Sequence, residues 1–323
     1  MRLSIRLSLL LLAMLAGCAG SGIERDPLHL KVMSFNAWGA GMNDGRPVED
    51  TVAVIRRINP DILGLQEQRA EAPVCNGAVC PATGSGRATE IARQLGYHVY
   101  VQDQENDALW ANAIISRYPI ISSTPNALGV VLQIGERRVG VFNIHATDYP
   151  YQPYQATSIE YGDAPFLQAE RELVAAADQA RGKAITLLLQ DIATLEDVDA
   201  TFVTGDFNEP SHRDWTQRAA DLGVHPLRVD YPSPRRLENA GFFDTYLALF
   251  PDEIDHPGFT WTPTSAADDP DDHHDRIDYV LMRAANARVL SADVAGEVSA
   301  HSSIEFSRWP SDHRAMVVTV AIP

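Results

Sequence analysis

The sequence has few cysteines, few basic residues and one long hydrophobic run. Its 323 residues include three cysteines, and 26 Lys and Arg stand against 43 Asp and Glu, which gives a net charge of −17. A multi-spanning membrane protein is excluded, because a long uncharged apolar run occurs only within the first twenty residues. The scarcity of basic residues argues against a basic nucleic-acid groove as the main feature. An acidic enzyme that acts on phosphates would need metal ions to offset its own field.

The hydrophobic run has the features of an export signal. Arg2 and Arg6 precede an apolar stretch over residues 7–15, which is too short to span a bilayer. The stretch ends in Leu15-Ala16-Gly17-Cys18, and small residues before a cysteine resemble a bacterial lipobox. In a lipobox the chain is cut before the cysteine and the thiol is acylated. The alternative is an ordinary signal peptide followed by an incidental cysteine.

Lipidation at Cys18 would define the maturation and the location of the protein. Residues 1–17 would be a signal peptide and residues 18–26 a lipidated tether, and loss of two arginines would take the net charge to −19. The mature chain would be a membrane-anchored lipoprotein of the cell envelope, on the periplasmic or outer surface, held there by its lipid alone. Cys75 and Cys80 form an even pair in such an exported chain, which favours a small loop disulfide.

Residues 27–323 have the pattern of one domain with mixed strands and helices. Apolar spacing predicts helices over residues 48–58, 88–95 and about 166–195, with Gly182 as a potential break in the last. Strands are predicted over residues 30–36, 61–67, 97–101, 111–116, 120–123, 130–134, 139–145, 201–205, 259–262, 277–282, 288–291 and 315–321. The five strands between residues 97 and 145 are spaced as an antiparallel meander. The mixture predicts two sheets packed face to face with helices outside.

Several predicted strands begin or end in polar residues that a packed core would not need. The pieces are Phe35-Asn36, Gln66-Glu67, Asn143-Ile144-His145, Gly205-Asp206-Phe207-Asn208, Arg276-Ile277-Asp278-Tyr279 and Ser311-Asp312-His313. If these ends meet at one edge, they form a pocket of carboxylates, amides and two imidazoles. Oxygen ligands of this kind suit Mg²⁺, Mn²⁺ or Ca²⁺ rather than zinc. A hard metal ion beside acidic residues and histidines can catalyse phosphoester hydrolysis.

In this order along the chain, the six pieces resemble the endonuclease/exonuclease/phosphatase superfamily. The resemblance covers about residues 30–320 and implies an α/β fold, a four-layer sandwich of two packed mixed or antiparallel sheets flanked by helices. It implies a divalent-metal-dependent hydrolase of phosphoric esters. Asn36, Glu67 and Asp312 stand where the family holds its metal, Mg²⁺ or Mn²⁺, with Glu67 as the principal ligand.

The resemblance also implies a role for each residue of the reacting group. His145 stands where a histidine contacts the scissile phosphate, and Asp206 and Asn208 match the pair that orients or activates the attacking water. His313 matches the histidine beside the phosphoryl group, and Asp278 matches the carboxylate that orients it. Such an Asp–His pair raises the pKa of the imidazole, which favours its cationic form next to phosphate.

Flanking segments are candidates for substrate binding. Tyr149, Tyr151 and Tyr154 follow His145 closely and predict an aromatic pocket wall, with a surface loop stiffened by Tyr and Pro as the alternative. His212 and Arg213 follow the water-positioning pair and are further candidates. The acidic run over residues 268–275 is typical of a solvated loop, although beside the site it would repel polyanions or bind a second cation.

The predicted function is hydrolysis of a phosphoester by water at an enzyme anchored outside the cytoplasm. The substrate would be a sugar phosphate, a lipid head group or a nucleotide, and no obligate protein partner is predicted. The acidic charge and the tyrosines favour a small or sparsely charged substrate over long DNA. The alternatives are a secreted nuclease and a non-catalytic surface lipoprotein that binds a phosphorylated ligand.

Overall fold

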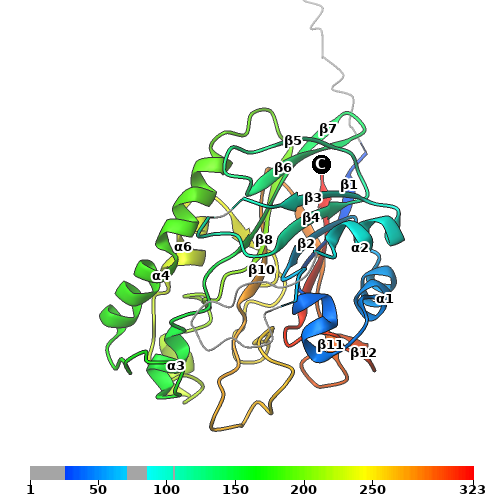
Figure 1. Cartoon of the computed structure of the whole chain (residues 1–323). Coiled ribbons are helices and arrows are strands. Elements are labelled where there is room, and N and C mark those ends of the chain that lie inside the picture. Colours follow the sequence, from blue (N-terminus) through cyan, green and yellow to red (C-terminus); the bar gives the residue numbers. More distant parts are fainter. Residues whose placement is uncertain (1–25, 71–85, 105) are drawn as a thin grey trace, which may run out of the picture.

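The computed structural model describes residues 26–70, 86–104 and 106–323, whose strands form two sheets packed face to face (Figure 1). The order of the first sheet is β12 (Ile304–Phe306), β11 (Arg288–Glu297), β13 (Ala315–Ile322), β1 (Leu28–Asn36), β2 (Ile62–Gln66), β4 (Asn112–Ser116) and β3 (His98–Gln102). The order of the second is β5 (Ile120–Ser123), β6 (Gly129–Ile134), β7 (Arg137–His145), β8 (Ala200–Asp206), β10 (Asp278–Ala284) and β9 (Phe243–Asp244).

Helices cover the outer faces of both sheets (Figure 1). On the first sheet lie α1 (Val48–Ile58) and α2 (Ala88–Leu95), and η1 (Gly39–Asp44) leads into α1. On the second sheet lie α4 (Glu170–Ile192) and α6 (Pro232–Asn239), while α3 (Gln152–Thr157) and α5 (Gln217–Asp221) are short helices in connections. The two sheets are mixed, because β1 with β2, β7 with β8 and β11 with β12 pair in parallel. The predicted α/β sandwich of two packed sheets with flanking helices is therefore confirmed.

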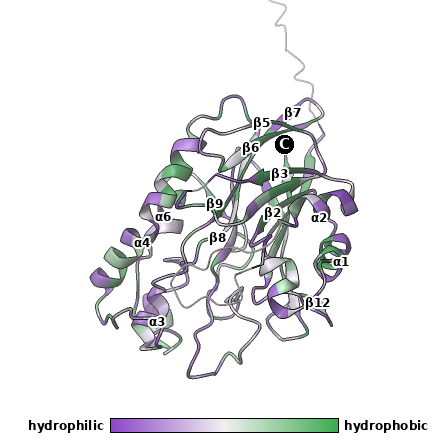
Figure 2. Ribbon diagram, viewed as in Figure 1, coloured by the Kyte–Doolittle hydropathy of each residue, from purple (hydrophilic) through white to green (hydrophobic). Residues whose placement is uncertain are grey.

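The layers follow from the alternation of side chains along the strands. In β1, Leu30 and Val32 belong to the core between the two sheets, whereas Met33 and Phe35 belong to the core under α1 and α2. Successive residues of a strand point to opposite faces, so one strand can serve both cores. The helices carry hydrophilic and hydrophobic residues together, as α1 and α4 show in Figure 2, because only one side of each meets a sheet.

Most predicted elements are present, and three expectations need correction. Helices α1 and α2 have the predicted bounds, but α4 runs unbroken through Gly182. A helix-interior glycine costs only about 1 kcal/mol, which burial of neighbours such as Ile185 and Leu188 offsets. The predicted meander is split between the sheets, because β3 and β4 pair in the first and β5 to β7 in the second. No strand forms over residues 259–262, where Trp261 makes only isolated bridges.

The predicted features of export fall largely on residues outside the described ranges. Cys18 and the signal peptide lie there, as do Cys75 and Cys80, so the lipid anchor and the disulfide stay predictions. Among residues 26–70, 86–104 and 106–323, no helix is both long enough and apolar enough to cross a membrane.

Candidate active site

Strand pairing brings the predicted polar residues to one edge of the sandwich. In the second sheet His145 pairs with Asp206, and Asp206 pairs with Asp278, so the three residues form one rung across β7, β8 and β10. In the first sheet Asn36 ends β1 beside the end of β2, and Glu67 follows β2 directly. Because β1, β2, β7 and β8 all end at this edge, their terminal side chains converge there, as the sequence predicts.

Asp206 lies at the centre of the group. Its Oδ2 accepts a hydrogen bond from Asn36 Nδ2 at 3.0 Å. The same oxygen is 3.5 Å from His145 Nε2 and 3.7 Å from His313 Nε2. These two distances exceed the normal hydrogen-bond range, so both imidazoles face the carboxylate without a hydrogen bond to it. Each ring nitrogen can therefore reach a further oxygen atom beside the carboxylate. This arrangement could bind a water molecule and a phosphoryl group side by side.

His313 is held as a cation. Its Nδ1 lies 2.9 Å from Asp278 Oδ2. Burial alone would lower the pKa of His313, but the charges of Asp278 and Asp206 outweigh burial and raise the pKa to about 10. Burial raises the pKa of Asp278 above its ordinary value, and the facing imidazolium opposes that rise. At neutral pH the ring therefore presents a positive charge where a phosphoryl group would develop negative charge.

Two side chains to which the sequence analysis gave no role hold the Asp278–His313 pair in place. Thr260 Oγ1 accepts hydrogen bonds from the backbone N–H groups of Ile277 and Asp278. Ser311 Oγ donates to the Asn36 carbonyl and accepts from the His313 N–H, which ties the end of β1 to the segment that leads into its neighbour β13 in the first sheet. Single Thr and Ser residues carry no sequence signal that separates such a role from an ordinary turn.

Glu67 has the environment of a cation ligand. The residue is 9% exposed and adopts φ 50°, a left-handed conformation that non-glycine residues rarely take outside constrained sites. Its Oε1 accepts from Asn36 Nδ2 at 2.8 Å, and its buried Oε2 has no hydrogen-bond partner. Burial raises the pKa of Glu67 to about 7; the His145 charge lowers it, and the nearby Asp312 carboxylate raises it further. A buried carboxylate with an unsatisfied oxygen beside a second carboxylate fits a divalent cation.

Asn36 is arranged differently from the way the sequence implied. Its nitrogen faces the Glu67 and Asp206 carboxylates, while its Oδ1 accepts from the Trp38 N–H at 3.1 Å. In this arrangement Asn36 orients the two carboxylates. Its Oδ1 would face the same side as their oxygens only if the side-chain amide flipped. Direct ligation by Asn36 therefore stays a prediction, whereas its place between Glu67 and Asp206 is defined.

The turn after β8 fixes the second member of the water-positioning pair. Asn208 donates its backbone N–H to Asp206 Oδ1 at 2.8 Å and its Nδ2 to the Ala146 carbonyl at 3.1 Å. The residue adopts φ 48°, which Asn tolerates better than most residues. Neither bond uses its side-chain oxygen, so Asn208 keeps one acceptor for a water next to Asp206.

A buried amide network lies under the site, between the sheets. Asn143 Nδ2 donates to the carbonyls of Leu65 and Ala113, and Gln66 Nε2 donates to Asn143 Oδ1. The sheets approach closely here, because a side chain at Gly64 would place its Cβ 1.9 Å from Thr204 Oγ1. The network fixes how the end of β2, which carries Glu67, sits against β7 and β8.

The tyrosine segment is held to the acidic run over residues 268–275. Tyr151 is 5% exposed, and its hydroxyl donates to Asp275 Oδ2 at 2.8 Å. The Tyr154 hydroxyl donates to Asp272 Oδ1, and the Tyr149 hydroxyl donates to Asp163. The surface-loop alternative does not describe Tyr151, which packs into the protein. Tyr149 and Tyr154 are less enclosed, and substrate contact by these tyrosines stays a prediction.

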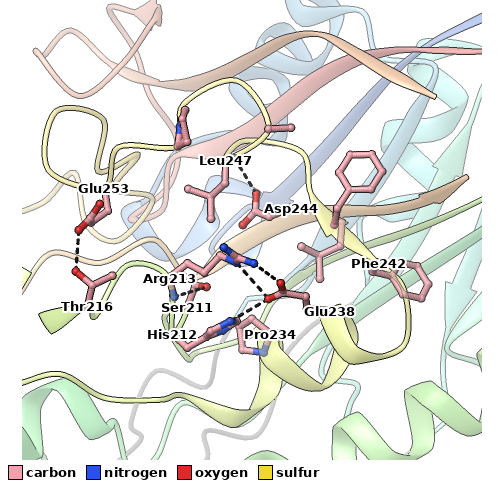
Figure 3. A pocket seen from close by; sticks show the side chains of 14 residues that line it. Ser211, His212, Arg213, Thr216, Pro234, Glu238, Phe242, Asp244, Leu247 and Glu253 are labelled. Atoms are coloured by element: carbon pink, nitrogen blue, oxygen red, sulfur yellow. Dashed lines mark hydrogen bonds and ion pairs between the residues drawn. The ribbon is translucent and has the colours of Figure 1, made fainter. Parts of the chain in front are cut away.

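His212 and Arg213 line a different cavity. Both pair with Glu238 on α6, His212 Nε2 at 2.9 Å from Glu238 Oε2 (Figure 3). This cavity of about 620 Å³ is also lined by Phe242, Asp244 and other residues, but by none of the polar group around Asp206. The structure thus does not bring His212 and Arg213 together with the other predicted site residues.

Comparison with known families identifies a relationship over nearly the whole domain. Residues 33–313 match the model of the Endonuclease/Exonuclease/phosphatase family. An uncharacterized protein of Caenorhabditis elegans, F14F9.5, is 24% identical over 330 residues, which cover 95% of this chain and 96% of the relative.

Solved structures share the fold at low sequence identity. An endonuclease/exonuclease/phosphatase from Beutenbergia cavernae DSM 12333 is 17% identical and superimposes with a TM-score of 0.53, over 92% of this chain and 72% of the other. D. rerio TDP2 complexed with single strand DNA product is 16% identical, with a TM-score of 0.51 over 90% and 98%. The 3′ phosphatase NExo from Neisseria bound to product DNA hairpin is 17% identical, with a TM-score of 0.51 over 90% and 98%.

Proposed function

The chain belongs to the endonuclease/exonuclease/phosphatase family, whose enzymes hydrolyse phosphoesters with a divalent metal, and from this premise we propose that it is a Mg²⁺-dependent phosphodiesterase or phosphatase. The observation that carries the proposal is the placement of the Asp206 carboxylate between His145 and the cationic His313, next to the unsatisfied Glu67 oxygen.

Asp206 and Asn208 act on the nucleophile. Asp206 accepts the proton of the attacking water, and Asn208 orients that water with its remaining side-chain oxygen. Asn36 donates to Asp206 and keeps its carboxylate facing the pocket. The water oxygen forms a bond to phosphorus, the bond between phosphorus and the alcohol oxygen breaks, and the departing oxygen takes a proton from solvent.

The two histidines act on the phosphoryl group. His313, held by Asp278, presents an imidazolium Nε2–H to a phosphoryl oxygen. His145 Nδ1 lies 3.4 Å from the Trp110 carbonyl, which places its Nε2 toward Asp206 and Glu67. Both Nε2 atoms thus reach the same region, and the His313 Nε2–H, which points at developing charge there, stabilises the transition state.

Glu67 and Asp312 would hold the cation, and Asn36 would complete or orient that set. A bound Mg²⁺ or Mn²⁺ supplies charge neutralisation and Lewis-acid polarisation of the phosphoryl oxygens. Anionic oxygen donors favour these hard ions, and a bound cation would relieve the repulsion that Asp312 exerts on Glu67.

A small phosphoester of a sugar, lipid head group or nucleotide is the proposed substrate class. The acidic run over residues 268–275 and the net charge of −17 both oppose a long polyanion. A DNA-end phosphoesterase is the second candidate, because two fold relatives were solved with DNA products. Attachment to a membrane outside the cytoplasm through acylated Cys18 completes the proposal.

A substrate panel tests this function. The panel contains bis(p-nitrophenyl) phosphate, a nitrophenyl phosphate monoester, a sugar phosphate, a phospholipid and a single strand with a 3′-phosphate, each with Mg²⁺, Mn²⁺ or chelator. We expect turnover that chelator abolishes and that is fastest on a small ester. Fastest turnover of the DNA end would favour the second candidate, and no turnover of any substrate would leave a binding protein.

The anchor has its own test. Cys18→Ser should block lipidation and leave the signal peptide uncut, so that the precursor keeps its N-terminal apolar segment. Mass spectrometry that finds an unmodified mature N-terminus downstream of Cys18 would contradict lipidation.

A further inference from the structure

A second cluster of possible metal ligands lies outside the group around Asp206. It consists of His225, His273 and Asp275, whose nearest ligand atoms all lie within 4.8 Å of one another. His225 and Asp275 are buried, at 6% and 2% exposure. The cluster joins the connection between α5 and α6 to the acidic run over residues 268–275, and none of its members has a role in the proposed hydrolysis.

The two imidazoles are already placed like a pair of ligands. His225 Nδ1 and His273 Nε2 are 3.0 Å apart and face each other. Two nitrogens bound to one tetrahedral zinc ion are about 3.3 Å apart, because each Zn–N bond is about 2.0–2.1 Å. To bind such an ion, the distance between the two nitrogens needs to grow by only a few tenths of an ångström. The Asp275 carboxylate needs to move toward the two nitrogens.

The charge states of the three residues also suit a cation. Burial lowers the pKa of His225 to about 3 and of His273 to about 4, so both rings are neutral, as metal ligands must be. Burial raises the pKa of Asp275 to about 8, so a metal ion that binds this carboxyl group displaces its proton.

One buried indole contacts all three candidate ligands. The Trp215 ring stacks on His225 with centroids 4.2 Å apart, lies 5.4 Å from the His273 ring, and donates its Nε1–H to Asp275 Oδ1 at 2.8 Å. Tyr151 donates to the other oxygen of Asp275, and the Asp214 main chain hydrogen-bonds His225. Metal ligands are commonly oriented by surrounding groups of this kind.

From this arrangement we propose that His225, His273 and Asp275 form a second metal site, separate from the hydrolytic one, that binds Zn²⁺. Two imidazoles and one carboxylate, with water as a fourth ligand, favour zinc over the Mg²⁺ expected at Glu67. The ion would cross-link loops 48 residues apart. Asp275 pairs with Trp261, which in turn bridges to His313, so the ion would stiffen one wall of the active site.

Metal binding to the untagged full chain tests the proposal. After chelator treatment, the chain is titrated with Zn²⁺ by calorimetry in excess Mg²⁺, and with Co²⁺ while visible absorption is recorded. We expect one tight Zn²⁺ per chain, the intense absorption of four-coordinate Co²⁺, a change in Trp fluorescence, and a Tm that rises by a few degrees with Zn²⁺.

Three variants assign the binding to this cluster. His273→Ala should weaken Zn²⁺ binding on the order of 100-fold or more. His274→Ala is the matched control, because its neighbouring ring contacts Ser265 instead, and it should bind Zn²⁺ like the unchanged protein. Glu67→Gln should also retain the site, so that loss of the hydrolytic metal and loss of this metal are distinguished.

Three results would overturn the proposal. They are a Co²⁺ spectrum of the unchanged protein without four-coordinate absorption, equal Zn²⁺ affinity of the His273→Ala and His274→Ala variants, and Zn²⁺ uptake that Glu67→Gln abolishes. The first needs no variant, so it stands even if His273→Ala fails to fold. In each case the His225–His273 contact would be a simple N–H···N hydrogen bond.

Discussion

The hydrolytic group and the second cluster place histidines and aspartates in opposite electrostatic settings. His313 faces Asp278 and Asp206, and their charges raise its pKa to about 10 against the lowering effect of burial. His225 faces another imidazole, and burial together with that neighbour lowers its pKa to about 3. The same buried side chain is therefore a cation in one group and neutral in the other.

This difference separates the ligands that the two groups can take. A cationic imidazole beside a carboxylate attracts an anion such as a phosphoryl group and donates to it. Neutral imidazoles offer nitrogen lone pairs to a metal cation, and the neighbouring carboxyl group can join them as a ligand by releasing its proton. Which of these applies depends on the number of carboxylates around each ring rather than on the residue types present.

The largest expected effect is on the group around Asp206. Asp206→Asn and His313→Ala should each lower kcat by about 10²–10⁴-fold, because each removes a proton-transfer group or a transition-state donor. Asp61→Asn, at the opposite end of β2 in a pair with Arg117, is the control and should leave kcat nearly unchanged. Steady-state kinetics on a phosphodiester measures both; a loss confined to KM would assign the two residues to binding.

A smaller effect is expected where a proton competes with the metal. Glu67→Gln should lower activity by about 10–100-fold at limiting Mg²⁺, with partial recovery at high Mg²⁺, because the ligand charge is lost. Burial raises the pKa of Glu67 to about 7, so Mg²⁺ affinity of the unchanged protein should fall as pH drops below 7. Glu90→Gln on α2 is the control. Equal rates for Glu67→Gln and the unchanged protein at limiting Mg²⁺ would contradict the assignment of the metal.

The tyrosine segment contacts Asp275 of the second cluster and, through Trp261, the ring of His313, and it should affect substrate choice. Tyr154→Ala should weaken binding of a cognate substrate by roughly 5–150-fold if the ring stacks on it. Tyr154→Phe keeps the ring and loses the hydroxyl's hydrogen bonds with Asp272 and with Trp261 Nε1, so it should retain most of the affinity that comes from the ring. KM values for the best ester of the panel and for an aryl phosphodiester compare the variants. Equal losses on both substrates would indicate a structural role.

The smallest effect concerns stability in the second cluster without metal. Burial raises the pKa of Asp275 from near 4 to about 8, so between these values the folded protein holds a proton that the unfolded chain has released. The free energy of unfolding should therefore fall as pH rises through this range. Asp275→Asn should flatten that slope, and Asp271→Asn, in the exposed part of the same run, should not. Denaturant unfolding with chelator from pH 5 to 8 measures the slopes, and parallel curves for Asp275→Asn and the unchanged protein would rule out this role.

Local pattern predicts much of the fold and of the hydrolytic group. The bounds of α1 and α2 follow from apolar spacing, and Asn59-Pro60 and Gly96 mark their ends. Polar residues at strand ends locate Glu67, His145 and Asp206. The strand predicted over residues 259–262 is wrong, because a strand needs a partner along its length and Trp261 finds only single bridges.

The sequence by itself determined the layered α/β fold and the residue types of the hydrolytic group, because periodicity and the polar ends of strands are local. The tertiary structure alone decided that His212 and Arg213 face Glu238, that Tyr151 is buried on Asp275, and that His225 meets His273. It also decided which histidine is charged. These outcomes depend on contacts between segments far apart in the chain and on the removal of water from those contacts. Neither the contacts nor their burial can be predicted from the local sequence pattern.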